Sequence, residues 1–181
     1  MANSLCSAYF SQSISEKSRH FHDCHQLIFI SAGEAYVTVG GETYRAKSGS
    51  LVVFSRFERH AIDVCSTVYK RYALELVTDE ERSDSDDYLL SSVLVNRAEG
   101  FRHVIDMGSC AAEMAHLFAG MAREYAQRPP MYEDMLDAAL RAILITVYRV
   151  APELSSTDRS RSSGIVYGSF SVFSIIAPSM K

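Results

Sequence analysis

The chain has 181 residues, of which 48% are hydrophobic and 22% are charged, so it can bury one core and a small appendage. A net charge of −4 and a pI near 5.8 exclude the basic surface that phosphate contacts require, and we expect no direct DNA binding by this chain. The four cysteines are irregularly spaced, and no apolar run approaches the roughly 20 residues of a membrane span, which predicts a reduced, cytoplasmic protein without a membrane segment.

Strand signals dominate residues 1–78. Short runs of β-branched and aromatic residues are separated by small residues such as Gly40 and Gly41, which reversing strands need. We expect a meander of antiparallel strands with an edge strand at its N-terminal end. The last run alternates so that Tyr72, Leu74 and Leu76 are expected to point inward. The runs expected as strands are residues 4–14, 26–31, 34–39, 42–47, 51–55, 60–66 and 67–77.

Histidines stand at both ends of this region. His20 and His22 point to one face of an extended segment because strand side chains alternate, and Gln26 falls on the same face. His60 opens a later strand, where it can meet the first two across a barrel. We therefore expect three imidazoles and an amide to converge, either as polar groups lining a binding site or as metal ligands. His25 has the opposite parity and is expected to point outward.

The remaining chain divides into three parts. Residues 79–108 begin with six acids against one arginine and are expected to form an exposed linker with short connecting elements on the barrel. Helices are predicted at 109–128, with Ser109 as N-cap, and at 131–150, joined by Pro129 and Pro130 into a hairpin. Apolar positions on more than one face predict a homodimer, with Leu140 and Leu144 as contacts. Residues 153–181 follow the hairpin, 109–152, as a poorly ordered tail.

The run HFHDCHQLIFISAGEAYVTVGGETYRAKSGSLVVFSRFERHAI, followed by a last strand, an acidic break and two helices ending in LRAILITVYRVAP, resembles the N-terminal cupin domain of AraC-type transcription regulators. This resemblance implies a mostly β fold with C-terminal helices: a cupin barrel, that is a jelly-roll or double-stranded β-helix, followed by an antiparallel helical hairpin. In such regulators the barrel holds a small effector, the helices dimerise and a C-terminal helix-turn-helix domain reads DNA. The 29 residues after Pro152 resemble no such domain, so we expect it to be lacking here.

The same stretch resembles the two general cupin motifs. His20, His22 and Gly33 match the first motif, with Gln26 where a glutamate is usual, and His60 ends the second. In metal-dependent cupins these positions bind a divalent metal. The amide of Gln26 removes a negative charge, which leaves three neutral imidazoles that favour zinc or copper over manganese. Zinc, nickel, iron and copper are the candidate metals, and sensing itself requires no cofactor.

The resemblance implies an effector-sensing and dimerisation domain and not an enzyme. The alternative is a small metal-dependent cupin dioxygenase or isomerase, which would need an open metal site or an inward acid and base. No inward carboxylate is evident from the alternation, and the helical hairpin exceeds what a minimal catalytic barrel needs. The side chains expected to surround the small molecule are His20, His22, Gln26, Ile28, Ile30, Phe54, His60, Tyr72 and Leu74.

Overall fold

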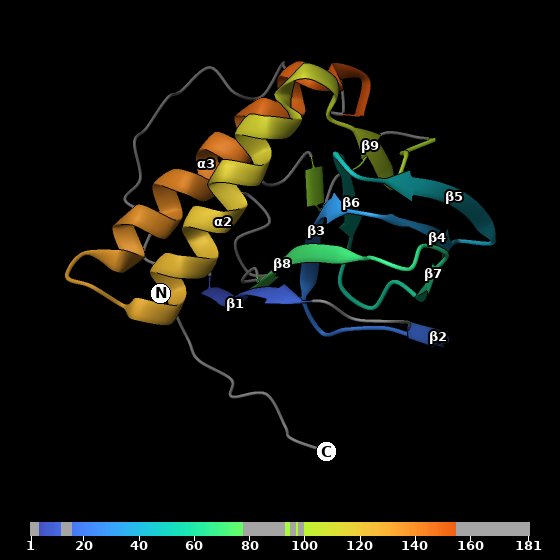
Figure 1. The fold of residues 1–181 in the computed structure, drawn as a ribbon, viewed down its shortest axis with the longest axis horizontal. Coiled ribbons are helices and arrows are strands. Elements are labelled where there is room, and N and C mark those ends of the chain that lie inside the picture. Colours follow the sequence, from blue (N-terminus) through green and yellow to red (C-terminus); the bar gives the residue numbers. More distant parts are fainter. Residues whose placement is uncertain (1–3, 12–15, 78–92, 95–96, 98–99, 155–181) are drawn as a thin grey trace.

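The computed structural model describes residues 4–11, 16–77, 93–94, 97 and 100–154, and these form two antiparallel sheets and a helical hairpin (Figure 1). The first sheet has the strand order β1 (Ser4–Ser11), β8 (Lys70–Val77), β3 (His25–Ala32), β6 (Ser50–Phe54) and β9 (Val104–Asp106). The second has the order β2 (Glu16–His20), β7 (His60–Val64), β4 (Glu34–Val39) and β5 (Glu42–Lys47).

The expected strands are present, but their pairing is not that of a meander. Among the described strands, β4 and β5 are the only consecutive pair that forms a hairpin, and both of its turn glycines have positive φ, 60° at Gly40 and 88° at Gly41. Strand β3 instead pairs with β6 and β8, and β4 pairs with β7. The two sheets exchange no strand in the described residues, so the expected barrel is not closed by backbone pairing.

Strand β3 separates two hydrophobic cores. Leu27 and Phe29 point to the outer face of the five-stranded sheet, while Ile28 and Ile30 point into the space between the two sheets. The core between the sheets also takes side chains from β4, β5, β6, β7 and β8. Because both faces of β3 are covered, its residues from His25 to Ile30 are all buried, which is why the run reads as continuously apolar after Gln26.

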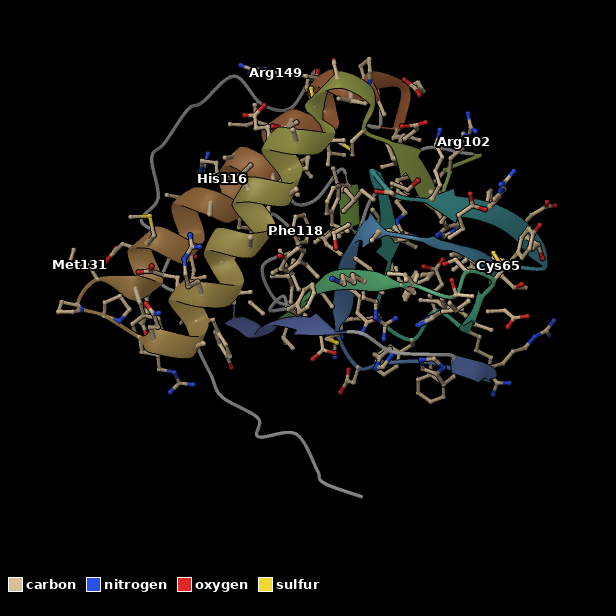
Figure 2. The ribbon with its side chains drawn as sticks, viewed as in Figure 1. Cys65, Arg102, His116, Phe118, Met131 and Arg149 are labelled. Carbon is tan, nitrogen blue, oxygen red and sulfur yellow. The ribbon has the colours of Figure 1, made fainter. Side chains whose placement is uncertain are left out.

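The outer core is covered by α2 (Ala111–Gln127), which lies against the five-stranded sheet, and by α3 (Tyr132–Val150), which packs side by side with α2 (Figure 1). Phe118 of α2 is fully buried and its ring stacks on Phe29 at 5.6 Å (Figure 2). Short 3-10 turns flank the hairpin at η3 (Gly108–Cys110) and η4 (Pro152–Leu154). The predicted N-cap at Ser109 is wrong, because Ser109 lies within η3 and Cys110 precedes α2 without a side-chain cap.

Leu140 and Leu144 are 7% and 2% exposed and belong to the core beneath the helices. Within one copy of the chain they pack in the core that α2 and α3 share, which leaves little of their surface for a second copy. The pairing of two copies stays a prediction.

The acidic run and the tail from residue 155 lie outside the described residues, so the predictions made for them, and for the division of the chain at 78, 108 and 152, stay predictions. No described helix has the length and apolarity that crossing a bilayer demands.

Candidate functional site

Three histidines converge at one end of the space between the sheets. His20 and His60 are direct cross-strand partners of β2 and β7, and His22 follows two residues after β2. One ring nitrogen from each lies within 4.8 Å of the other two. His60 is buried, and His20 and His22 are half-buried. The structure thus brings together the three imidazoles that the sequence predicted to meet.

His60 is held on two sides. Its Nδ1 lies 2.8 Å from the backbone carbonyl oxygen of Glu58, and because a carbonyl can only accept, Nδ1 carries the proton. In the neutral ring this leaves the lone pair on Nε2. The ring also stacks on Phe54 at 3.8 Å with an interplanar angle of 10°. Both the tautomer and the ring plane of His60 are therefore set by the protein.

Gln26 lies in β3 between Phe54 of β6 and Glu75 of β8. It is 3% exposed, and its Nε2 donates a hydrogen bond of 3.1 Å to Oε1 of Glu75. Glu75 has the same parity as Ala73, which belongs to the core between the sheets. Sequence reasoning missed this carboxylate and judged that no inward carboxylate was present. The structure supplies one on the strand next to Gln26.

The alternation of β8 was assigned to the wrong sides. Leu74 is 1% exposed and lies in the core beneath the helices, and Tyr72 packs against that same core. The expectation that Tyr72 and Leu74 line the inner site is therefore wrong. Ile28, Ile30 and Phe54 do lie between the sheets, where they form one hydrophobic cluster with the neighbouring strands.

The residues fit a divalent cation. Three neutral imidazoles are a common ligand set for zinc and related metals, whose Zn–N distance of about 2.1 Å requires ligand nitrogens roughly 3.4 Å apart in a tetrahedral site. The three histidines are within 4.8 Å of one another, so small side-chain rotations would bring them to that spacing. His60 already has the second hydrogen bond that metal-binding histidines usually make.

A turn at residues 55–59 supports two of the three histidines. Phe57 has a positive φ of 59°, and its N–H donates to the carbonyl oxygen of His22 at 2.8 Å. Glu58 accepts from His60, as described above, and Arg56 forms an ion pair of 2.6 Å with Asp23. No motif in the sequence predicted this support.

His25 points away from the three-histidine cluster, as its parity predicts, but its side chain is buried and does not reach solvent. It is 4% exposed, and burial, followed by the positive charges of Arg97 and Arg56, lowers its pKa from 6.5 to about 4 against the opposing effect of Glu58. His25 is therefore a neutral buried side chain.

Residues 12–72, fewer than half of the chain, match the family model described as Cupin domain. No curated protein matches the chain. Similar solved structures include a conserved Streptococcus pyogenes protein of unknown function, with 21% identity, 40% of this chain and 62% of that chain covered, and a TM-score of 0.35. A variant of Bacillus subtilis oxalate decarboxylase has 16% identity over 38% of this chain and 19% of that chain, with a TM-score of 0.32.

A third similar structure is an RmlC-like cupin family protein from Methanocaldococcus jannaschii, with 15% identity over 39% of this chain and 66% of that chain, and a TM-score of 0.34. The chain spans less than two thirds of the length of each of these three proteins. At such identities the likeness concerns the fold alone.

Proposed function

We propose that this chain, with a cupin domain match at residues 12–72, is the effector-sensing and dimerisation part of an AraC-type transcription regulator. The observation that carries the proposal is the position of β3, which separates the core between the two sheets from the core beneath the helices. Its inner face carries Gln26, the cross-strand partner of Phe54, whose ring stacks on His60, and its outer face carries Leu27 and Phe29 against the helical hairpin. A small molecule bound on the inner face would act on the same strand that supports the helices.

The inner site would bind the small molecule through His20, His22 and His60, with Gln26 beside them. If a divalent cation were bound, these three imidazoles would hold it, and it would supply Lewis-acid chemistry at the site. Gln26 is oriented by Glu75 through the hydrogen bond of its Nε2, which leaves the amide oxygen as its acceptor group. The buried ring of Phe54 stacks on the ring of His60 and so limits its orientation.

A thermal-shift screen of untagged protein tests this proposal, with small polar molecules added in the presence of EDTA or of zinc. We expect selective stabilisation by one class of compound, and we expect His60→Ala to remove it. His116→Ala is the matched control, because His116 is exposed on α2, far in the chain from the site (Figure 2). If His22→Ala and His60→Ala bind every compound as the parent does, the site is wrongly assigned.

The hairpin would join two copies of the chain. Met131 and Met135, at the start of α3, are 73% and 58% exposed, and Figure 2 shows Met131 at the tip of the hairpin. We expect a dimer in light scattering that Met135→Glu disrupts. Val68→Glu places the same charge at a residue with a similar exposure of 56%, before β8, and should leave the dimer intact. A dimer unaffected by Met135→Glu would contradict this use of the helix.

The chain alone would not bind specific DNA, since its net charge of −4 offers little attraction to phosphates. A gel-shift experiment with the purified chain tests this, and a salt-resistant, sequence-dependent shift would contradict it.

A metal-dependent cupin enzyme is the second candidate, and Glu75 is the observation that favours it. An inward carboxylate that accepts a hydrogen bond from Gln26 could serve as a general base. Metal analysis of the untagged protein separates the two candidates. Stoichiometric redox-active metal, together with oxygen consumption that Glu75→Gln abolishes, would favour the enzyme. Ligand-induced stabilisation without turnover would favour the sensor.

A further inference from the structure

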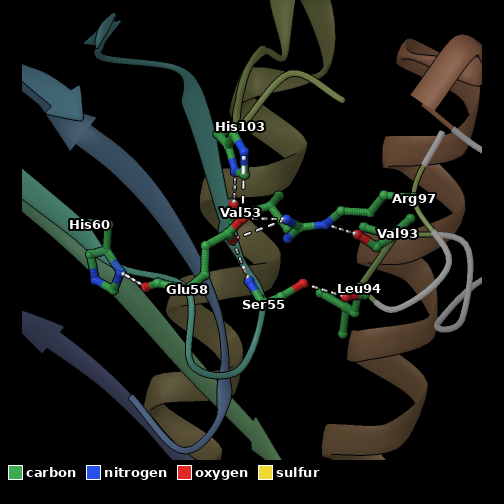
Figure 3. Close-up of polar contacts among 8 residues, drawn as sticks. All are labelled: Val53, Ser55, Glu58, His60, Val93, Leu94, Arg97 and His103. Atoms are coloured by element: carbon green, nitrogen blue, oxygen red, sulfur yellow. Dashed lines mark hydrogen bonds and ion pairs between the residues drawn. The ribbon is translucent and has the colours of Figure 1, made fainter. Parts of the chain in front are cut away.

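The side chain of Glu58 is clamped beside the three-histidine site by residues from a distant part of the chain (Figure 3). Arg97 Nη1 lies 3.0 Å from Oε2 and 3.3 Å from Oε1 of Glu58. The backbone N–H of Ser55 donates to Oε2 at 2.8 Å, and His103 Nε2 lies 3.6 Å from Oε1. The side chains of Arg97 and Glu58 are only 12% and 25% exposed, so water screens this ion pair weakly.

Arg97 is itself fixed in place. Its Nε donates to the carbonyl oxygen of Val93 at 3.2 Å, and its guanidinium lies over the ring of Phe101 at 4.2 Å. A planar guanidinium held on one side by a carbonyl and on its face by an aromatic ring has few alternative positions. It therefore presents Nη1 to Glu58 as a rigid donor.

The clamp reaches the histidines through the backbone of the turn at residues 55–59. The carbonyl of Glu58 accepts from Nδ1 of His60, and the adjacent N–H of Phe57 donates to the carbonyl of His22. A second hydrogen bond fixes the same turn, because Ser55 Oγ donates to the carbonyl oxygen of Leu94 at 2.6 Å. Figure 3 shows His60, Glu58 and Arg97 in a row, with Ser55 and His103 on either side of the carboxylate.

From this geometry we infer that Arg97 is a positioning residue of the three-histidine site, acting through Glu58 to fix the tautomer and orientation of His60. The inference rests on the proposed function only in treating the three histidines as a binding site. Arg97 acts from outside the cluster of ligating rings, and it is 39 positions along the chain from Glu58, with the whole of β8 between them. The site is therefore dependent on the segment that continues through β9 into α2.

Removing the guanidinium should loosen the turn. Without Arg97, the Glu58 carboxylate loses its charged partner and is left to the Ser55 N–H and His103, so the carbonyl that orients His60 is less well fixed. The imidazole would then populate both tautomers, and Nε2 would no longer always carry the lone pair that binds a metal. Outer partners of this kind typically change metal affinity by about 10- to 100-fold when they are removed.

Two measurements test the role of Arg97. The first is the imidazole ¹⁵N spectrum of metal-free protein in EDTA, above the ordinary imidazole pKa, with the His60 signals identified from His60→Ala. The parent should show His60 protonated on Nδ1, and Arg97→Ala should show a mixture of tautomers. The second is calorimetric titration with zinc, in which Arg97→Ala should bind about 10- to 100-fold more weakly than the parent.

Matched variants separate positioning from folding. Arg97→Lys keeps the charge without the planar fork and should restore part of the zinc affinity. Arg45→Ala breaks a surface ion pair of 2.7 Å with Glu34 on β4 and β5 and should leave both readouts unchanged. If Arg97→Ala fails to fold, Arg97→Lys and Glu58→Gln carry the same two measurements.

A folded Arg97→Ala protein with the parent tautomer of His60 and the parent zinc affinity would overturn the inference. If the parent itself binds no zinc, the metal part of the proposed function fails, and the tautomer of His60 in the metal-free variants still decides the role of Arg97.

Discussion

Mild acid should destabilise this protein through His25. Its pKa is lowered from 6.5 to about 4, first by burial and then by Arg97 and Arg56, with Glu58 acting in the opposite direction. Because the folded pKa lies below the unfolded one, the folded chain binds the proton more weakly. The stability that this buried neutral ring contributes is complete above the unfolded pKa of 6.5 and is lost as the pH falls towards 4.

The size of the effect follows from the shift. A difference between 6.5 and about 4 corresponds to about 3 kcal/mol in total, since one pKa unit is worth about 1.4 kcal/mol. About 2 kcal/mol of this should be lost by about pH 5. His25 is only 4% exposed, so solvent screening removes little of the effect. For a domain of this size, such a loss is a large fraction of the total stability.

Urea unfolding at a series of pH values between about 7.5 and about 4.5 measures the effect. His25→Gln replaces the ring by a neutral side chain that does not titrate, and its stability should depend on pH less steeply by the amount given above. His116→Gln changes an exposed histidine on α2 and should keep the parent profile. An unchanged pH slope in His25→Gln would show that another group carries the acid sensitivity.

Two further substitutions test the packing that supports the site. Gly33→Ala should be clearly more destabilising than Gly41→Ala in urea unfolding. Both positions have positive φ, but only a Cβ at residue 33 would overlap the carbonyl oxygen of Val68. Equal losses of stability in the two variants would refute this contact. Leu144→Ala should cost about 2–5 kcal/mol by leaving a cavity in the core, and the half-buried Ile145→Ala should cost less. A Leu144→Ala protein that stays stable but changes its oligomeric state would return Leu144 to a contact between copies.

Local patterns predicted the strands and the meeting of the histidines. The two-residue period predicted one face for His20, His22 and Gln26; β2 ends at His20 and Gln26 lies on the other sheet, but His60 opens β7 directly opposite His20, as the meeting of the histidines requires. These predictions depended only on alternation and on the small residues between runs. The choice of strand partners did not follow from such signals, because an apolar strand such as β6 carries no mark of which strands flank it, and here they are β3 and β9.

The face of β8 was misjudged for a physical reason. Alternation shows which residues share a face but not which face is inside, and this sheet has a core on each side. The larger apolar side chains Leu74 and Leu76 were assigned to the barrel, whereas they pack under α2 and α3. Glu75 was therefore placed outside. When helices cover the outer face of a sheet, that face is also apolar, so the more apolar face need not line the barrel.

The support of His60 could not be predicted locally at all. Glu58 and Arg97 are ordinary charged residues in the sequence, and their contact joins segments 39 residues apart. Only tertiary packing makes them a shielded pair.

The contact between Gln26 and Glu75 leads to a prediction whose sign depends on metal. Gln26→Glu replaces a hydrogen bond of 3.1 Å between directly paired residues by two carboxylates, one at the buried position 26 and one at the half-buried Glu75. In EDTA this should cost about 1–3 kcal/mol, since one carboxylate must become protonated or remain unpaired. With zinc, the added carboxylate beside three neutral imidazoles should strengthen binding, so the metal should stabilise the variant more than the parent.

The exchanged pair, Gln26→Glu with Glu75→Gln, is the matched control. It keeps one amide and one carboxylate on β3 and β8 and should regain most of the stability in EDTA, because the amide can again donate to a carboxylate. Urea unfolding of the three proteins, with and without zinc, makes the comparison. If Gln26→Glu is as stable as the parent in EDTA, the hydrogen bond to Glu75 does not hold Gln26. If zinc stabilises all three proteins equally, then residue 26 does not face the bound metal. The three histidines would then bind zinc without a contribution from β3, the strand that packs against the helices.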